Sequence, residues 1–239
     1  MTIKVTLSGA MGRMGRRVGV ELNAMDGVMF VCGLVRGSCV STKECFAPLT
    51  DDAFAAVRSC DVLMDFTNID STLKLARICA ELKRPIFVGT TTRRAKDIEM
   101  LKEIATDIPV LYAPNITRGA AALFGVLQEL AHRLGPIYDT KVLGIHHRDK
   151  KETPSGTSSE MARCIQEGRG DDILPEISTV LAGGAYGTHE ALFAGHNDEI
   201  RVVHTVTRPD IDGCVLSAGL EWLMAKPAGF FGISEVLAK

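Results

Sequence analysis

Titratable side chains gather in one short segment of the sequence. Residues 144–160 read GIHHRDKKETPSGTSSE, so that His146, His147 and Lys150 stand shortly before a Pro-Ser-Gly-Thr turn. An imidazole can donate or accept a proton near neutral pH, and an ammonium group attracts anions. This set of groups suits a small dianionic substrate that is protonated during a reaction. The alternative is a solvent-exposed loop that leads into a helix.

The turn in this segment adds backbone donors. Thr157-Ser158-Ser159-Glu160 fits the capping-box pattern and predicts a helix over about 157–168. The amides around Gly156 and Thr157 then lie at a helix N-terminus, which binds carboxylates and phosphates. His146 and His147 end a predicted strand, where neighbouring side chains point to opposite faces. We expect no metal here, because no acidic or cysteine ligand completes a set nearby.

A glycine-rich segment follows the first predicted strand. Gly9, Gly12 and Gly15 give the spacing GxxGxxG, and Arg13 and Arg16 add positive charge. Small residues let the backbone turn tightly, and a pyrophosphate can then approach the free N–H groups of the helix N-terminus. The position at the first strand–helix junction favours a dinucleotide site over simple helix packing.

The end of the second predicted strand bears on the type of dinucleotide. Sites that prefer NAD usually have an acidic residue here for the ribose 2′-hydroxyl, whereas an arginine favours a 2′-phosphate. This chain reads Val35-Arg36, and a guanidinium can bind a phosphate through two hydrogen bonds. We therefore favour NADPH, with NADH possible. The alternative is that Arg36 is only a solvated loop residue.

The first half of the chain alternates strands with helices. Strands are predicted at 3–8, 28–35, 61–66, 85–89 and 109–113, and helices at about 12–24, 70–83, 94–106 and 117–134. This alternation predicts a Rossmann-type doubly wound parallel sheet of the α/β class, which binds ligands at the carboxyl ends of its strands. Two loops stand at such ends, Gly89-Thr90-Thr91 and Ala113-Pro114-Asn115-Ile116.

The pattern changes after about residue 117. Strands are predicted at 139–147, 176–182, 187–194 and 199–207, with one helix among them. Strands without intervening helices predict a second α+β domain with a mixed or antiparallel sheet. We expect a dinucleotide-binding domain over 1–116, completed by about 210–239 with a helix at 213–225, and a second domain over 117–209.

Composition limits the class of protein. The 239 residues carry a net charge of −2, with 46% hydrophobic residues, so we expect neither nucleic acid nor a membrane surface as a partner. We find no apolar stretch long enough for a membrane helix and no targeting pattern. The seven cysteines lack CxxC spacing, which favours free thiols and a cytoplasmic location.

Several motifs, in this order, resemble the dihydrodipicolinate reductase family of lysine biosynthesis. They are GAMGRMG at 9–15, DFT at 65–67, GTT at 89–91, the loop around Asn115 and HHRDKKETPSGT at 146–157. The pattern HHxxKxxxPSGT is the specific one. The resemblance implies that NAD(P)H reduces 4-hydroxy-tetrahydrodipicolinate, a cyclic unsaturated dicarboxylate, to tetrahydrodipicolinate in the diaminopimelate route to lysine.

The resemblance also implies roles for individual residues. His146 is then the general acid/base and Lys150 a proton donor that also faces the substrate, while His147, Gly156 and Thr157 bind its carboxylates. The second domain, over 117–209, becomes the substrate-binding and oligomerisation domain of a homotetramer, and it closes on the first domain during turnover. The residues implied to line the dinucleotide are Gly9, Ala10, Met11, Gly12, Arg13, Met14, Arg36, Gly89, Thr90, Thr91, Ala113, Pro114, Asn115 and Ile116.

The chain departs from the family pattern in three places. Val35 stands where an acidic residue is usual. Leu181 and Thr188 stand where the motif Arg-Gly-Gly-x-x-x-Gly-Glu-His has its arginine and its glutamate, and the segment 209–216 lacks a Phe-Ala-x-Gly-Ala stretch. These departures affect cofactor preference, substrate-side detail and subunit contacts. Two other functions stay open. One is another two-domain NAD(P)-dependent dehydrogenase, such as a semialdehyde dehydrogenase with a nucleophilic cysteine. The other is a non-catalytic NADPH-sensing relative.

Overall fold

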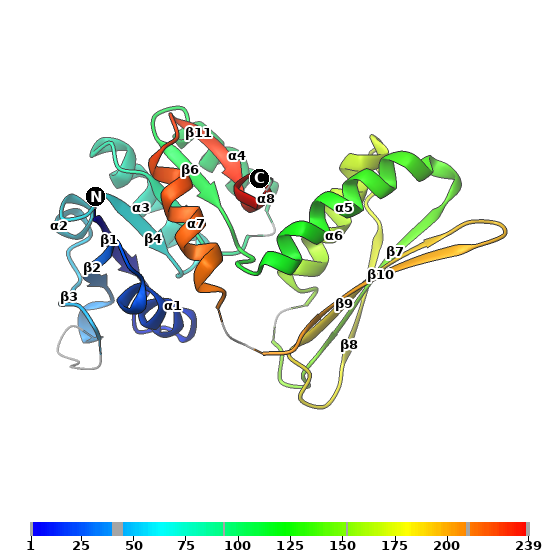
Figure 1. Ribbon diagram of the computed structural model, residues 1–239, viewed down its shortest axis with the longest axis horizontal. Helices are drawn as coiled ribbons and strands as arrows, with labels where there is room; N and C mark the ends of the chain where they lie inside the picture. Colours follow the sequence, from blue (N-terminus) through cyan, green and yellow to red (C-terminus); the bar gives the residue numbers. More distant parts are fainter. Residues whose placement is uncertain (1, 40–44, 93, 152, 209–210, 238–239) are drawn as a thin grey trace. The chain divides into compact units, whose positions relative to one another are not determined.

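The chain forms two compact units. The computed structural model describes residues 2–39, 45–92, 94–151, 153–208 and 211–237. The first unit comprises residues 1–116 and 211–239, and the second comprises residues 117–210. Each unit has its own sheet and its own hydrophobic core (Figure 1).

A seven-stranded sheet forms the centre of the first unit. Its strand order is β11-β6-β5-β4-β1-β2-β3, and every strand pair is parallel. The predicted Rossmann-type doubly wound sheet is therefore confirmed. The strands are β1 (Ile3–Ser8), β2 (Val28–Leu34), β3 (Leu49–Thr50), β4 (Val62–Asp65), β5 (Ile86–Val88), β6 (Pro109–Tyr112) and β11 (Gly229–Gly232). The helices are α1 (Arg13–Ala24), α2 (Ala53–Arg58), α3 (Ile69–Glu81), α4 (Ala95–Ile104), α7 (Gly213–Met224) and α8 (Ile233–Leu237), with a 3-10 turn, η1 (Gly37–Cys39).

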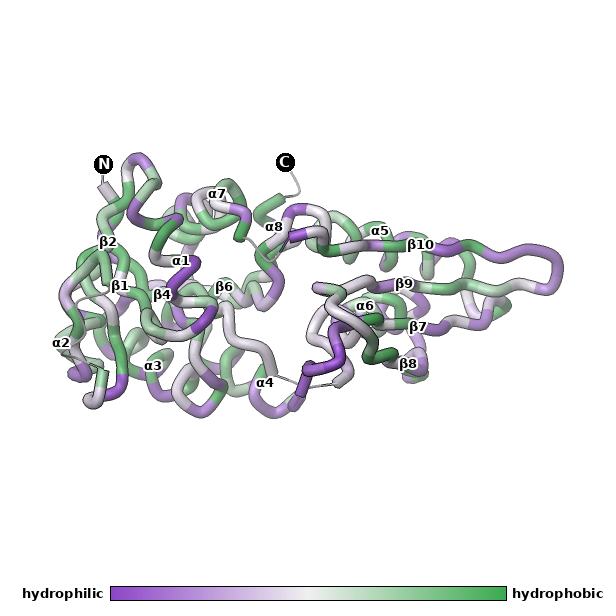
Figure 2. The backbone as a smooth tube through the Cα atoms, turned by 90° about the horizontal axis from the view of Figure 1, so that it is seen from below, coloured by the Kyte–Doolittle hydropathy of each residue, from purple (hydrophilic) through white to green (hydrophobic). Residues whose placement is uncertain are grey.

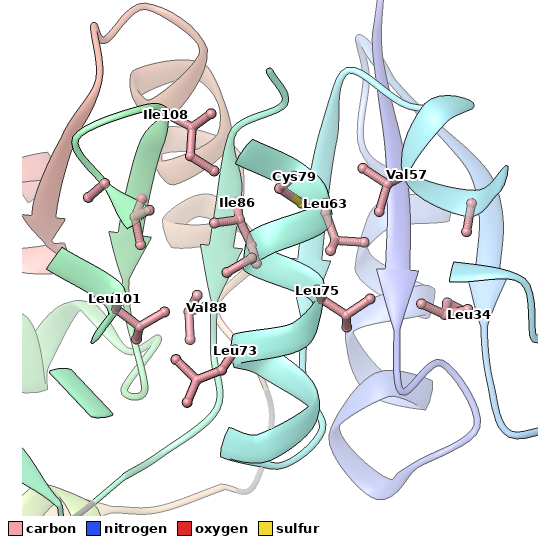
Figure 3. Close-up of a cluster of buried hydrophobic side chains, with 14 of the residues drawn as sticks. Leu34, Val57, Leu63, Leu73, Leu75, Cys79, Ile86, Val88, Leu101 and Ile108 are labelled. Atoms are coloured by element: carbon pink, nitrogen blue, oxygen red, sulfur yellow. The ribbon is translucent and has the colours of Figure 1, made fainter. Parts of the chain in front are cut away.

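Helix α3 illustrates how the sequence covers one face of this sheet. Its N-cap is Asn68, whose side chain accepts a hydrogen bond from the Ser71 N–H at 3.1 Å. Its apolar residues recur every three or four positions, so they share a face. Figure 3 shows Cys79 of this face beside Leu63 of β4 and Leu73 beside Val88 of β5, within a core that α2 and α4 extend.

Helices α1 and α7 pack on two strand side chains outside this core, Phe30 and Phe87. A Cβ on Gly19 of α1 would lie 3.5 Å from the ring of Phe30. A Cβ on Gly219 of α7 would lie 2.8 Å from the ring of Phe87, closer than carbon atoms normally approach. Glycine at 219 therefore lets α7 pack closely on β5. Because α7 and β11 belong to the C-terminal segment, that segment completes the first unit.

The second unit has a four-stranded mixed sheet with the order β10-β9-β7-β8. Strand β7 (Asp139–His146) pairs in parallel with β8 (Glu176–Leu181) and antiparallel with β9 (Gly187–Ala194), which pairs antiparallel with β10 (Glu199–Val206). Helices α5 (Arg118–Leu134) and α6 (Gly156–Arg169) pack on one face, and the 3-10 turn η2 (Gly135–Ile137) follows α5 (Figure 1). The predicted second α+β domain with a mixed sheet is confirmed.

The differences from the sequence prediction concern short elements and one cap. The elements β3, α2, β11 and α8 were not predicted, because segments of two to six residues carry too little periodicity. The capping box at Thr157 is wrong. Ser155 is the N-cap of α6, and its Oγ accepts from the Ser158 N–H at 3.0 Å, because Ser155 has an extended backbone and Thr157 is already helical. Over the described ranges, no helix has the length and apolar composition to cross a membrane.

The core of the second unit yields a stability prediction. Leu127 of α5 is fully buried, whereas its neighbour Val126 is 55% exposed. Leu127→Ala should lower the free energy of unfolding by about 2–5 kcal/mol, because it removes buried methyl groups and leaves a cavity. Val126→Ala, the matched control, should change it by less than about 0.5 kcal/mol. Urea unfolding of both variants is the measurement, and equal losses would contradict the placement of α5.

Candidate functional site

The candidate nucleotide residues lie on loops at one edge of the first sheet. Residues 9–14 follow β1, Arg36 follows β2, residues 89–91 follow β5 and residues 113–116 follow β6. Because all these strands are parallel, their carboxyl ends meet at the same edge. The neighbours of β1 are β2 on one side and β4 on the other. This reversal of the winding is where doubly wound sheets bind ligands.

The glycine loop has the geometry of a pyrophosphate cradle. Gly9 has a φ of +77°, and a Cβ there would lie 2.5 Å from the Phe66 carbonyl oxygen. A Cβ on Gly15 would collide with the backbone of Gly9. Gly12 is the N-cap of α1, so it has no side chain to satisfy the first N–H groups, and the first turn carries no acidic residue. The loop therefore fits a dinucleotide, since an anion can reach these donors.

A buried carboxylate connects the loops at this edge. Asp65 ends β4 and is fully buried. It accepts hydrogen bonds from the hydroxyls of Thr67 at 2.7 Å, Thr72 at 2.5 Å and Thr90 at 2.8 Å. The Thr67 N–H also donates to Thr90 Oγ1 at 3.0 Å. Asp65 thereby joins the loop after β4, helix α3 and the loop after β5. In the sequence Asp65 appears only as part of the motif DFT, which does not reveal these bonds.

The glycine loop yields a prediction with a matched control. Gly9 and Gly27 both have positive φ, at +77° and +75°, but a Cβ on Gly27 would meet nothing within 4 Å. Gly27→Ala should cost only the backbone strain, about 1–2 kcal/mol of stability, with unchanged nucleotide binding. Gly9→Ala should also displace the loop and weaken NADPH binding at least about tenfold, because the anion then loses its backbone donors. Fluorescence titration with NADPH measures both, and wild-type affinity in Gly9→Ala would refute the cradle.

The candidate substrate residues all lie in the second unit. His146 ends β7, His147 and Lys150 follow it, and Gly156 and Thr157 are the first two residues of α6. His146 is buried, at 3% exposure, while His147 and Lys150 are half-buried. Burial is the main cause of a lowered pKa of His146, and the positive charge of Lys150 lowers this pKa further. Lys150 is therefore close enough to influence how His146 titrates.

The His146 ring occupies space left by two glycines. A Cβ on Gly187 would lie 3.2 Å from its Nδ1, and a Cβ on Gly144 would lie 3.2 Å from its Nε2 and 2.8 Å from Ser158 Oγ. The backbone of Tyr186 forms a hydrogen bond that raises the pKa of the ring. Because only a hydrogen-bond acceptor stabilises the protonated ring, the partner of His146 is the backbone carbonyl of Tyr186. Nε2 is buried without a partner in the described part of the chain, so Nδ1 is the donor and Nε2 lies on the side of α6.

Two further histidines, His189 beside His146 and His204 beside His189, had no role in the prediction from sequence. The His189 ring lies edge-on to the His146 ring, with centroids 5.1 Å apart, and stacks on the His204 ring at 5.9 Å. Burial, followed by the charges of His146, His204 and Lys150, lowers the pKa of His189 to about 4. A repeated Gly-x-His pattern, at 144–146 and 187–189, is the signal that could have revealed the pairing. Across the described residues, no cluster of three or more possible ligands could hold a metal ion.

The buried His189 makes stability depend on pH. Its pKa is lowered from 6.5 to about 4 in the folded state, while the unfolded chain keeps the ordinary value. The unfolded state therefore binds more protons between these values, and stability falls as pH drops from 6.5 towards 4. The loss from this residue should approach about 1.4 kcal/mol per pH unit. Urea unfolding at several pH values should show a shallower acid loss in His189→Gln, and parallel curves would exclude a buried neutral ring.

Fold and site together define a class. A doubly wound sheet with a glycine-lined helix N-terminus, joined to an α+β unit that carries a titratable cluster, is typical of two-domain oxidoreductases that use a pyridine nucleotide. Residues 3–116 match the family model for Dihydrodipicolinate reductase, N-terminus, and residues 119–237 match the one for Dihydrodipicolinate reductase, C-terminus. The chain belongs to the dihydrodipicolinate reductase family, so the resemblance found in its motifs is confirmed.

Similar proteins support this membership over the whole chain. A 4-hydroxy-tetrahydrodipicolinate reductase from Geotalea daltonii is 30% identical over 263 residues, covering 98% of each chain. One from Trichlorobacter lovleyi is 29% identical with the same coverage. Among solved structures, a dipicolinate-bound dihydrodipicolinate reductase from Paenisporosarcina sp. TG-14 has a TM-score of 0.74 at 19% identity, covering 98% of this chain and 99% of that one, which shows a shared fold.

Family membership settles the type of enzyme. The chain is an NAD(P)H-dependent oxidoreductase of the diaminopimelate route to lysine, as its motifs indicated. A probable dehydrogenase from Thermotoga maritima shares the fold at a TM-score of 0.61 and 14% identity, covering 87% of this chain and 77% of that one. This broader likeness concerns the fold alone.

Proposed function

We propose that the chain reduces 4-hydroxy-tetrahydrodipicolinate to tetrahydrodipicolinate with NADPH as the preferred cofactor and NADH as a second one. His146 is the general acid/base, Lys150 supports it as a proton donor, and His147, Gly156 and Thr157 bind the substrate carboxylates. The observation that supports this best lies within the second unit. His146 Nε2, which has no hydrogen-bond partner among the described residues, lies on the side of α6, whose first turn begins with Gly156 and Thr157.

The site is suited to a dianionic substrate. Burial and the Lys150 charge lower the pKa of His146, so the free ring is neutral at pH 7. Carboxylates bound at the α6 amides and at Lys150 would add negative charge nearby and raise this pKa again. Binding of the dianionic substrate would thus favour the protonated form of His146, which is the proposed proton donor. The ring is neutral in the free enzyme, and the bound dianion would favour its protonation.

The residues act around a hydride that the nicotinamide supplies when bound. The glycine loop and the N-terminus of α1 would hold the pyrophosphate, and Thr90, which donates to Asp65, belongs to a loop proposed to line the dinucleotide. The 4-hydroxyl group has to leave as water for the reaction to balance, and His146 Nε2 would hold the proton that is then delivered to the unsaturated substrate ring. Lys150 attracts the substrate and replaces the proton. The α6 amides orient one carboxylate by hydrogen bonds.

The preference for NADPH rests on the end of β2. The Val35 side chain cannot accept a hydrogen bond from a ribose hydroxyl, and its backbone N–H donates to the Thr50 carbonyl at 2.9 Å. Arg36 is exposed at the carboxyl edge of the sheet, where a guanidinium can reach a 2′-phosphate. The remaining residues proposed for the dinucleotide are residues 9–14, 89–91 and 113–116.

The rival functions lack support at the residues they need. A semialdehyde dehydrogenase needs a reactive thiolate, but burial raises the pKa of the Cys164 thiol to about 12. Cys214 lies at the start of α7, where its backbone N–H donates to the Asp212 cap at 3.1 Å. A non-catalytic NADPH sensor would have no need for the His146–Lys150 pair, which this chain retains.

Assembly as a homotetramer is also part of the proposal. One face of the second sheet is covered by α5 and α6, and the other presents apolar side chains, including Val180 at 45% exposure and Val203 at 56%. A cavity of about 340 Å³ on this outer face is lined by Leu143 and Leu192 together with the charged residues Lys141, Glu176, Glu190 and Arg201. Burial of this face against other copies would remove apolar surface from water.

A coupled assay tests the function. The condensation product of pyruvate and aspartate-semialdehyde is supplied, and oxidation of NADPH and of NADH is followed by absorbance. We expect turnover with both and a lower KM for NADPH. Arg36→Ala should raise the KM for NADPH about tenfold, equal to about 1.4 kcal/mol, and leave that for NADH nearly unchanged.

The assay has one control variant, and two different results would each refute one part of the proposal. Arg133→Ala removes an exposed arginine of α5, in the other unit, and should leave both KM values as in the wild type. Consumption of neither cofactor would refute the proposed reaction. An equal rise of both KM values in Arg36→Ala would refute the 2′-phosphate contact while leaving the reaction intact.

A further inference from the structure

A row of residues crosses the second sheet beneath its helices. Gly144 of β7 lies directly opposite His189 of β9, and His189 lies directly opposite His204 of β10. Figure 1 shows these three strands side by side. The alternation along each strand places the row on the inner face, because the buried Val142 of β7 and Ala191 of β9 share that face.

The first position of the row has no side chain, and His146 uses that space. The ring nitrogens approach the places where Cβ atoms of Gly144 and Gly187 would be. The His189 ring lies edge-on against the His146 ring, at an interplanar angle of 63°. His204 supports His189 by stacking at 23°, and its own Nε2 would lie 3.4 Å from a Cβ on Gly119, in the first turn of α5.

The chemistry of His189 is unusual for a residue that only fills space. Its side chain is 3% exposed, and neither ring nitrogen has a hydrogen-bond partner among the described residues. A buried polar group without hydrogen-bond partners destabilises the folded state. An apolar side chain would avoid this cost, so a buried imidazole in contact with a proposed proton donor calls for a functional explanation.

We infer that His189 and His204 are positioning residues that hold the His146 ring in one orientation, with Nδ1 donating to the Tyr186 carbonyl and Nε2 directed towards α6. The inference rests on the proposed role of His146 and adds two residues to it. They act through His146 by packing and contact no reacting atom. The edge-to-face contact fixes the plane of the ring, and the stack on His204 prevents His189 from turning away.

His189 must also remain uncharged. The charged or titratable groups that influence it are His146 and Lys150, from β7 and the loop after it, and His204, from β10. Each of these is cationic when protonated. A second cation in the row would oppose a proton on His146. Burial and these neighbours keep His189 neutral at pH 7, so the cationic form of His146 has a neutral aromatic neighbour.

Nitrogen-15 NMR of the histidine side chains tests this directly. In the wild type, at a pH above the titration of His146, we expect a single tautomer with the proton on Nδ1. His146→Gln identifies the signals by their loss. In His189→Leu the ring should lose its fixed orientation, so that the two nitrogen shifts converge as tautomers mix. His204→Leu should also bring the two nitrogen shifts closer together, but by less, because His204 contacts His146 only through His189.

Measurements of kcat and of NADPH binding distinguish a positioning role of His189 from a purely structural one. His189→Leu should lower kcat at least about tenfold while the NADPH dissociation constant stays within about twofold. The matched control is His196→Leu, in the exposed turn between β9 and β10 whose residues are hydrophilic (Figure 2). It should change neither the His146 signals nor kcat.

Two results would overturn the inference. One is a wild-type His146 with its proton on Nε2. The other is retention of the Nδ1 tautomer and of kcat in both leucine variants. If His189→Leu does not fold, the wild-type tautomer and His204→Leu still decide. The NMR measurement needs no turnover, so failure of the proposed reaction and failure of the positioning role can be told apart.

Discussion

The space above Gly144 and Gly187 is the constraint on which the proposed catalytic geometry depends. Any side chain at either position would displace the His146 ring, whose nitrogens would lie 3.2 Å from the added carbon atoms. The ring is therefore buried beside the first turn of α6, with one nitrogen bound to a backbone carbonyl and the other left without a partner in the described part of the chain. Burial lowers the pKa of the ring and prepares it to respond to a dianion.

In the first unit, the loops of the proposed nucleotide site are held in place by a different interaction, the hydrogen bonds of a buried carboxylate. Loops at the carboxyl edge of a parallel sheet have few contacts of their own, and Asp65 supplies three of them through threonine hydroxyls. A buried carboxylate has to be fully hydrogen-bonded, so these bonds also keep the loops in place. The glycine loop then packs against Phe66 and Thr67. Each unit thus fixes its own chemical groups before any ligand arrives.

Much of the fold followed from periodicity, and much of the site did not. Long elements such as α5 and β9 carry enough residues to reveal their period, and their predicted ends agree with the structure within one residue. Pairings between distant segments leave no such trace. His189 meets His146, and His204 meets His189, only because β9 lies between β7 and β10. Likewise, the Asp65 bonds to Thr72 and Thr90 depend on how α3 and β5 pack.

The central claim is that the second unit delivers a proton through His146 while the first unit holds the nucleotide. Single-turnover oxidation of enzyme-bound NADPH, after mixing with saturating substrate, tests it most directly. His146→Gln should slow this step at least about a hundredfold with NADPH affinity unchanged, as loss of a general acid does. Lys151→Met, an exposed neighbour of the site, should leave the rate as in the wild type. A wild-type rate in His146→Gln would contradict the account.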